Sequence, residues 1–94
     1  MNEIVLIHSA QADLLEIYSR HGEKIYNHVD RELEVIRNMP EIAPVYHDHF
    51  RRKLVHGTPF GIFFTITGNR LMVSFVMDLR QDPAAILKRL QSGR

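Results

Sequence analysis

The sequence predicts an α+β domain in which a helical hairpin packs on a mainly antiparallel four-stranded sheet, in the order β-α-α-β-β-β-α. Three observations lead to this fold class. A chain of 94 residues suits one hydrophobic core, and a 45% share of hydrophobic residues is enough to build it. Apolar residues recur at helical spacing in the first half and alternate at strand spacing in the second. We therefore treat residues 1–94 as a single domain.

Two helices follow a short first strand in the first half of the chain. Residues 3–8 (EIVLIH) are rich in β-branched side chains, which favours a strand. Ser9 then stands where an N-cap is expected, and Gly22 suits the residue that ends the first helix. The second helix ends before Pro40, because the residue before a proline disfavours helical backbone. The apolar residues that define the two helices are Leu14, Leu15, Ile17 and Tyr18, then Tyr26, Val29, Leu33 and Ile36.

Three strands and a last helix make up the second half. Residues 51–56 (RRKLVH) predict a strand, and residues 60–67 (FGIFFTIT) alternate apolar side chains on one face. Residues 70–77 (RLMVSFVM) are apolar on both faces, as in a central strand. Asp82 then supplies an acidic cap and Pro83 a favourable first helical residue. The side chains expected to be buried are Phe60, Ile62, Phe64 and Ile66 in the strand, and Ile86, Leu87 and Leu90 in the helix.

The composition excludes several classes of protein. Without cysteine the chain has no disulfide framework, no thiolate zinc site and no cysteine nucleophile. No apolar run approaches the roughly 18–20 residues that a membrane span requires. The opening Met-Asn-Glu-Ile-Val lacks the basic region of a secretory leader. We therefore expect a cytoplasmic protein that does not contact membranes.

The two halves of the chain carry opposite charge. Residues 1–50 hold four Lys/Arg and nine Asp/Glu, whereas residues 51–94 hold eight and two. A basic half of this size can attract a polyanion or an acidic segment of a partner. Composition alone leaves open the alternative that the two halves neutralise each other across the fold.

The histidines do not predict a metal site. His47, Asp48 and His49 place two imidazoles on one side of an extended segment, but a metal site needs three or four ligands. No further ligand stands at a fixed spacing, so we expect neither a metal nor another cofactor. His56 is a candidate general acid or base, because imidazole titrates near neutral pH.

The candidate target-binding residues are basic. Arg51, Arg52 and Lys53 stand together, and guanidinium groups bind phosphate oxygens bidentately. On a strand, Arg51 and Lys53 share one face and Arg52 takes the other, so only part of the triplet can serve one site. The structural alternative is an edge strand that uses charge to prevent aggregation. Arg70 and Arg80 complete the set.

Arg80 lies between two carboxylates, at the predicted junction of the last strand and the last helix. Because Asp82 is placed as the helix cap, Arg80 is left to pair either with Asp78 or with an anionic ligand. The residue types alone leave both pairings open.

Three stretches share a pattern with one protein family. The stretch SAQADLLEIY (9–18) has an alanine followed by Asp-Leu-x-x-Ile on the first helix. The stretch RRKLVHGTPFGIFFTI (51–66) has paired arginines, a hairpin and a Pro-aromatic-x-aliphatic-aromatic-aromatic strand. The stretch VSFVMDLRQDPAAILKRL (73–90) has a final strand, an arginine, Asp-Pro and a terminal helix. In this order they resemble the RelE/ParE superfamily of bacterial toxins from type II toxin–antitoxin pairs.

The resemblance implies a toxin held inactive by a co-expressed antitoxin, which often wraps around it as an extended peptide. RelE-like members cleave mRNA in the ribosomal A site, whereas ParE-like members poison DNA gyrase without known nuclease chemistry. Asp78 stands where many members have a histidine used by some ribosome-dependent nucleases, and Gln81 where many have a second arginine. These departures favour a ParE-like toxin; a RelE-like nuclease and a non-toxic binding module are the alternatives.

The residues for nuclease chemistry stay unassigned. RNA cleavage needs a base for the 2′-hydroxyl, a cation for the phosphate and an acid for the leaving oxygen. Arg52 or Arg80 could supply the cation. No spacing selects among the candidate acids and bases. Separately, we expect Arg52 and Arg80 to matter for toxicity far more than for folding. The candidate acids and bases are Asp78, His56 and Tyr46.

Overall fold

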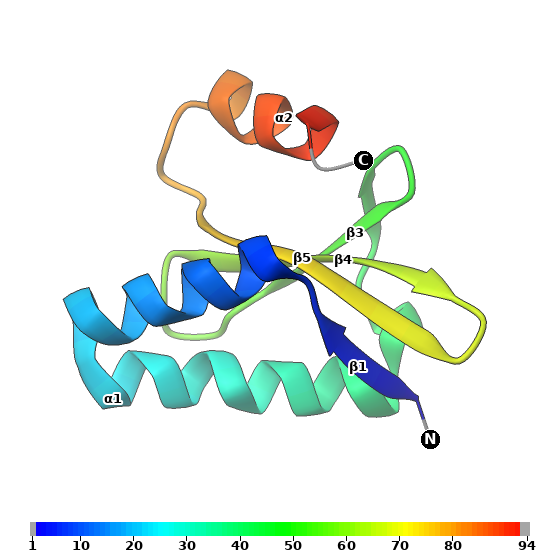
Figure 1. The fold of residues 1–94 in the computed structure, drawn as a ribbon, viewed down its shortest axis with the longest axis horizontal. Coiled ribbons are helices and arrows are strands. Elements are labelled where there is room, and N and C mark those ends of the chain that lie inside the picture. Colours follow the sequence, from blue (N-terminus) through cyan, green and yellow to red (C-terminus); the bar gives the residue numbers. More distant parts are fainter. Residues whose placement is uncertain (1, 93–94) are drawn as a thin grey trace.

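A computed structural model describes residues 2–92 and shows one five-stranded sheet between two helical layers (Figure 1). The long helix α1 covers one face of the sheet and the short helix α2 lies over the other. The elements in chain order are β1 (Glu3–Leu6), α1 (His8–Asn38), the 3₁₀ turn η1 (Pro40–Ile42), β2 (Val45–His47), β3 (Phe50–Leu54), β4 (Phe60–Thr67), β5 (Arg70–Asp78) and α2 (Pro83–Ser92).

The sheet has one strand more than the sequence predicts, and its pairing is mixed. The strand order is β1-β5-β4-β3-β2, with β1 parallel to β5 and the other pairs antiparallel. The prediction of four strands was wrong because β2 spans only Val45–His47, too short for a period of two to be read in the sequence. The parallel pair joins strands far apart in the chain, because α1 and the strands β2, β3 and β4 all lie between β1 and β5 in the sequence.

The predicted helical hairpin is confirmed within α1. Gly22 has the non-helical angles φ 82° and ψ −175°, so the element consists of two helical halves, residues 8–21 and 23–38. The halves run antiparallel side by side (Figure 1), and a positive φ favours glycine at the break. Ser9 is not the N-cap, however: the helix begins at His8, and the Ser9 hydroxyl donates a hydrogen bond to the carbonyl of Ser74.

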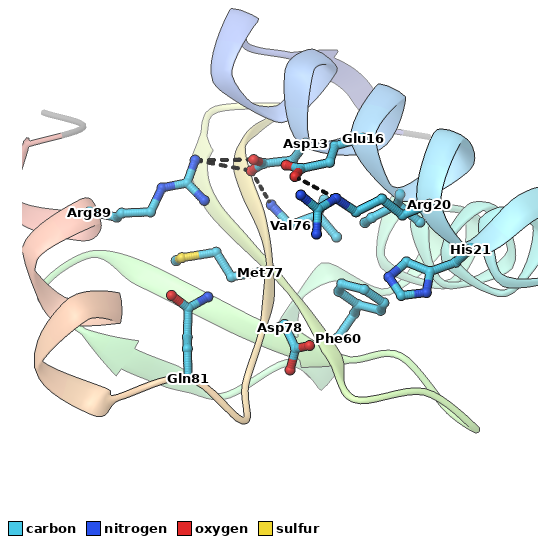
Figure 2. Close-up of a pocket in the computed structure, with 11 residues that line it drawn as sticks. Asp13, Glu16, Arg20, His21, Phe60, Val76, Met77, Asp78, Gln81 and Arg89 are labelled. Carbon is cyan, nitrogen blue, oxygen red and sulfur yellow. Dashed lines mark hydrogen bonds and ion pairs between the residues drawn. The ribbon is translucent and has the colours of Figure 1, made fainter.

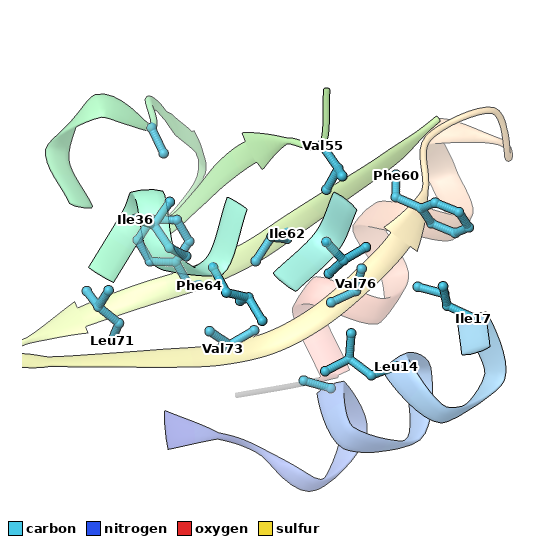
Figure 3. Packing of buried hydrophobic residues seen from close by; sticks show 14 residues of the cluster. Leu14, Ile17, Ile36, Val55, Phe60, Ile62, Phe64, Leu71, Val73 and Val76 are labelled. Carbon is cyan, nitrogen blue, oxygen red and sulfur yellow. The ribbon is translucent and has the colours of Figure 1, made fainter. Parts of the chain in front are cut away.

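Two apolar clusters hold the sheet to its helices. The larger lies between α1 and the sheet (Figure 3), and it includes the predicted stripe of β4, Phe60, Ile62 and Phe64, with Ile66 packed at its margin. The smaller lies under α2 and consists of Phe50, Phe63, Phe75, Met77, Ile86 and Leu90. Successive residues of β4 thus serve opposite faces, which is why this strand is buried along most of its length.

Helix α2 begins as the sequence predicts. The backbone N–H of Ala84 donates to Asp82 Oδ1 at 3.0 Å, which confirms Asp82 as the cap. The prediction for Leu87 was wrong: its side chain is 36% exposed, because Ile86 and Leu90 alone reach the sheet. Neither helix within residues 2–92 combines the length and the apolar character that a bilayer crossing requires.

Candidate functional site

Strand β3 holds its basic residues on opposite faces, as predicted. Arg51 Nη1 donates to the carbonyl of Ala43 at 2.7 Å. Lys53 Nζ lies 3.0 Å from Glu32 Oε1 of α1, in a pair whose side chains are only 20% and 13% exposed. Both side chains therefore have partners within the fold, on the side of α1.

Arg52 points to the other face and is held by an aromatic ring. Its guanidinium carbon lies 4.5 Å from the centre of the Tyr46 ring, and Tyr46 in turn meets Phe63 edge-on at 5.5 Å. Within residues 2–92 no carboxylate forms an ion pair with Arg52. A guanidinium packed on a ring in this way keeps its N–H donors for a ligand.

Arg70 and Arg80 lie at opposite ends of β5. Arg70 Nε pairs with Glu3 Oε1 at 2.9 Å, and both side chains are largely exposed. Arg80 binds Asp78 through two contacts, at 2.7 and 3.1 Å. At about 3.3 Å per residue the ends of β5 are roughly 26 Å apart, so the structure does not bring these two arginines into one site.

Asp78 is ionised and acts as an acceptor. Its hydrogen bond from the Arg80 side chain is the largest influence, and a second bond from the Arg80 backbone N–H adds to it. Together they hold the pKa of Asp78 below its ordinary value. A carboxylate in this state accepts a proton poorly, and it has none to give to a leaving group.

The strand register separates Arg52 from the Asp78–Arg80 pair. Arg52 faces Phe63, and Phe63 faces Phe75, which is three residues before Asp78 on β5. Two strand spacings across and three residues along the sheet amount to about 14 Å between the backbone positions. The candidate catalytic residues thus fall into separate places on the sheet.

A cleft of about 180 Å³ lies where α1, the end of β5 and α2 meet (Figure 2). Asp13 of α1 stands on one wall, where it accepts the backbone N–H of Val76 at 3.0 Å and Arg89 Nη2 at 3.2 Å through both oxygens. Burial raises the pKa of Asp13, while the bonds from Val76 and Arg89 oppose that rise. The other lining residues include Glu16, Arg20, His21, Phe60, Asp78 and Gln81.

The sequence predicted Asp78 as a candidate site residue, but it did not reveal the pair of Asp13 and Arg89 in the wall of this cleft. Asp13 and Arg89 are 76 positions apart, so no local spacing reveals the pair. The one available signal is a carboxylate directly before Leu14, on a helix face that otherwise points into the core. The pair anchors α2 to α1, and Arg89 also packs 4.6 Å from the centre of the Phe75 ring.

The predicted histidines lie outside this cleft. His56 is exposed in the turn after β3, and its backbone N–H donates to Glu32 Oε2 at 3.2 Å. His49 lies beside Asp48 in the turn between β2 and β3, with a side chain 91% exposed. In the described part of the chain no three His, Asp or Glu side chains gather as a metal site would need.

The architecture is similar to that of known proteins. No family model matches the sequence, and no curated protein matches it. Several solved structures do match. The toxin–antitoxin system ParDE from P. aeruginosa gives a TM-score of 0.70 at 14% identity, over 85% of this chain and 98% of the other. E. coli RelE gives a TM-score of 0.66 at 10% identity, over 96% of this chain and 99% of the other. E. coli YafQ gives a TM-score of 0.67 at 14% identity, over 92% of this chain and 98% of the other.

The chain has the RelE/ParE fold. Identities of 10% to 14% concern the fold alone, and the chemistry of this chain depends on its own side chains. On the face under α2, the centre of the sheet is apolar: Phe63 of β4 and Phe75 of β5 are buried there. Arg52 borders that apolar area with Tyr46, and Arg80 projects beyond the end of β5.

Proposed function

We propose that the protein is the toxin of a type II toxin–antitoxin pair, which inhibits growth by binding a macromolecular target and is neutralised by a cognate antitoxin. DNA gyrase is the target we favour. The observation that carries the proposal is the RelE/ParE fold, shared along nearly the whole chain with toxin structures. The three motifs of the sequence, which occur in the family order, support it independently.

The side chains support binding better than RNA cleavage. Among residues 2–92, the candidate cations Arg51, Lys53 and Arg80 have partners inside the protein. Arg52 packs on the ring of Tyr46 and, among residues 2–92, pairs with no carboxylate that could act as an acid or a base. A target bound through Arg52 and the exposed ring of Tyr46 requires no acid–base pair.

Expression of the protein alone is expected to arrest bacterial growth, and co-expression of the protein encoded by the adjacent reading frame is expected to relieve the arrest. Colony counts after induction, with and without the second protein, measure both effects. A small acidic DNA-binding protein in that frame fits an antitoxin. Normal growth despite abundant soluble protein would favour the alternative of a non-toxic binding module with the toxin fold.

The second candidate function is a RelE-like ribosome-dependent mRNA endonuclease, and we expect no such cleavage. Asp78 stands where the nuclease histidine is common, and its carboxylate is engaged by Arg80. Primer extension on a translated message tests this, with an inhibition assay of DNA supercoiling by gyrase beside it. Discrete A-site cuts that disappear in the Arg80→Ala variant would promote the endonuclease.

A further inference from the structure

Four exposed apolar side chains follow one another where α1 ends and the outer edge of the sheet begins. Met39, Ile42 and Val45 are 60%, 54% and 57% exposed, and Val35 is exposed as well. The backbone N–H of Met39 donates to the carbonyl of Val35 at 2.9 Å, and that of Ile42 donates to the carbonyl of Met39 at 3.1 Å. These residues are therefore neighbours in space, and we call the four side chains the apolar corner.

The apolar corner lies on the outside of the described part of the chain. The second half of α1 forms an outer layer of the molecule (Figure 1). The strand β2, which begins with Val45, is the last strand of the sheet, so one side of it has no strand beside it. Single exposed apolar side chains are common, but a contiguous group of them is typical of a surface that another protein covers.

Two charges of opposite sign flank the apolar corner. Arg31 lies one turn before Val35 on the same side of α1, and Glu41 lies beside Ile42 in η1. Both are exposed, and in the described part of the chain neither side chain forms a hydrogen bond or an ion pair. About 12 Å of helix separates Arg31 from Met39, so the corner has a positive end and a negative end.

We infer that the apolar corner is the contact between two copies of this chain related by a two-fold axis, with Arg31 of each copy beside Glu41 of the other. In a two-fold contact one surface meets itself with its ends reversed. The reversal places an unpaired cation beside an unpaired carboxylate at both ends, while the apolar side chains meet between them. A partner of one charge sign would match only one end, so the charges favour a second copy.

This contact leaves the proposed target-binding side open. The apolar corner belongs to the side of α1, whereas Arg52 and Tyr46 lie on the face under α2, where Tyr46 meets Phe63. A dimer therefore presents two Arg52 surfaces, and a target that offers two matching sites would be held more tightly than by the monomer. The dimer itself does not depend on the proposed toxin function.

The dimer is expected to be reversible because the apolar corner is small. Permanent dimers bury about 2,000 Å² or more in total, and this contact consists of four apolar side chains from each copy and two ion pairs. Its stability therefore depends on protein concentration. Analytical ultracentrifugation of the full chain from about 1 to 500 µM measures the equilibrium between monomer and dimer.

A carboxylate placed inside the apolar corner should disrupt the dimer. We expect Met39→Glu and Ile42→Glu each to weaken self-association about tenfold or more, because two copies of the new charge are desolvated at the contact. Leu15→Glu is the matched control and should leave self-association unchanged. Leu15 is 72% exposed, but it lies on the first half of α1, outside the corner.

A charge exchange tests the two-fold arrangement directly. Arg31→Glu places like charges opposite each other at both ends of the contact, and so does Glu41→Arg, so each single variant should weaken the dimer about tenfold. The double variant Arg31→Glu/Glu41→Arg restores opposite charges and should recover the affinity of the parent. Because both side chains are exposed, melting curves of all three variants should match that of the parent.

Three results would overturn the inference. The first is a parent chain that stays monomeric at the highest concentration, the second is a double variant that does not recover the affinity lost in the single variants, and the third is a dimer that Leu15→Glu disrupts and Met39→Glu does not. If the parent is monomeric and Met39→Glu instead abolishes binding of the adjacent-frame protein, the corner belongs to that partner. Growth arrest is measured separately, so failure of the toxin proposal leaves the result on the dimer standing.

Discussion

The variant Arg52→Ala is expected to lose growth arrest while keeping its fold. Arg52 stacks on Tyr46 and, in the described chain, has no carboxylate to pair with, so its removal leaves no buried charge behind. An arginine at the centre of an interface typically contributes about 2 kcal/mol or more, which is a loss of affinity of about 30-fold. The exposed stacking on Tyr46 contributes only about 0.5–1 kcal/mol to stability.

Plating efficiency and a melting curve on each variant check this expectation. Arg52→Lys keeps the charge but not the planar donors, so it should restore arrest only in part. Arg31→Ala is the matched control, because Arg31 is an exposed arginine on α1 away from that face. Arg80→Ala should also melt like the parent, since its pair with Asp78 is at the surface. An Arg52→Ala protein that remains fully toxic, or that unfolds, would remove Arg52 from the target-binding surface.

The variant Glu32→Ala is expected to lower the free energy of unfolding by about 2 kcal/mol. Glu32 joins α1 to the turn after β3: Oε1 pairs with Lys53 at 3.0 Å and Oε2 accepts the backbone N–H of His56 at 3.2 Å. Its removal leaves the Lys53 ammonium without a counter-charge in a position where that side chain is only 20% exposed, with a hydrogen bond to the carbonyl of Leu54 at 3.0 Å. For a domain of this size the melting temperature should fall by about 8–16 °C.

The effect of Glu32 should depend on pH in a defined direction. Burial raises the pKa of Glu32, but the bonds from Lys53 and His56 outweigh it, so the pKa lies below its ordinary 4.5. A group with a lowered folded pKa stabilises the protein above its unfolded pKa and loses that contribution in acid. The stability difference between the parent and Glu32→Gln should therefore be complete at pH 7 and shrink below about pH 4.5.

Denaturant unfolding of the parent and of Glu32→Gln, from pH 7 to below about pH 4.5, measures the difference in their free energies of unfolding. Glu16→Ala is the control, because Glu16 pairs with Arg20 where the two side chains are 60% and 72% exposed. Such a surface pair contributes about 0.5 kcal/mol or less. A Glu32→Ala protein as stable as Glu16→Ala would show that the link between α1 and the turn after β3 contributes nothing.

The sequence by itself determined the features that depend on a few neighbouring residues. Gly22 breaks the long helix because its positive φ is favoured in glycine, and Asp82 caps α2 through a bond within its own first turn. The opposed faces of Arg51 and Arg52 follow from the period of two in any strand. Helices and strands are predictable here because local backbone preference and apolar spacing agree.

Only the tertiary structure decided which charges stay available for a partner. Glu32 and His56 are 24 positions apart, and Asp13 and Arg89 are 76 apart, so no spacing in the chain predicts either contact. Lys53 and Arg89 have structural roles, because Lys53 pairs with Glu32 and Arg89 pairs with Asp13. Arg52 is distinguished from them by the fold, because β2, a strand too short to read in the sequence, brings an aromatic ring rather than a carboxylate to its side. Charge clustering shows that cations are present, but long-range packing determines which of them a partner can reach.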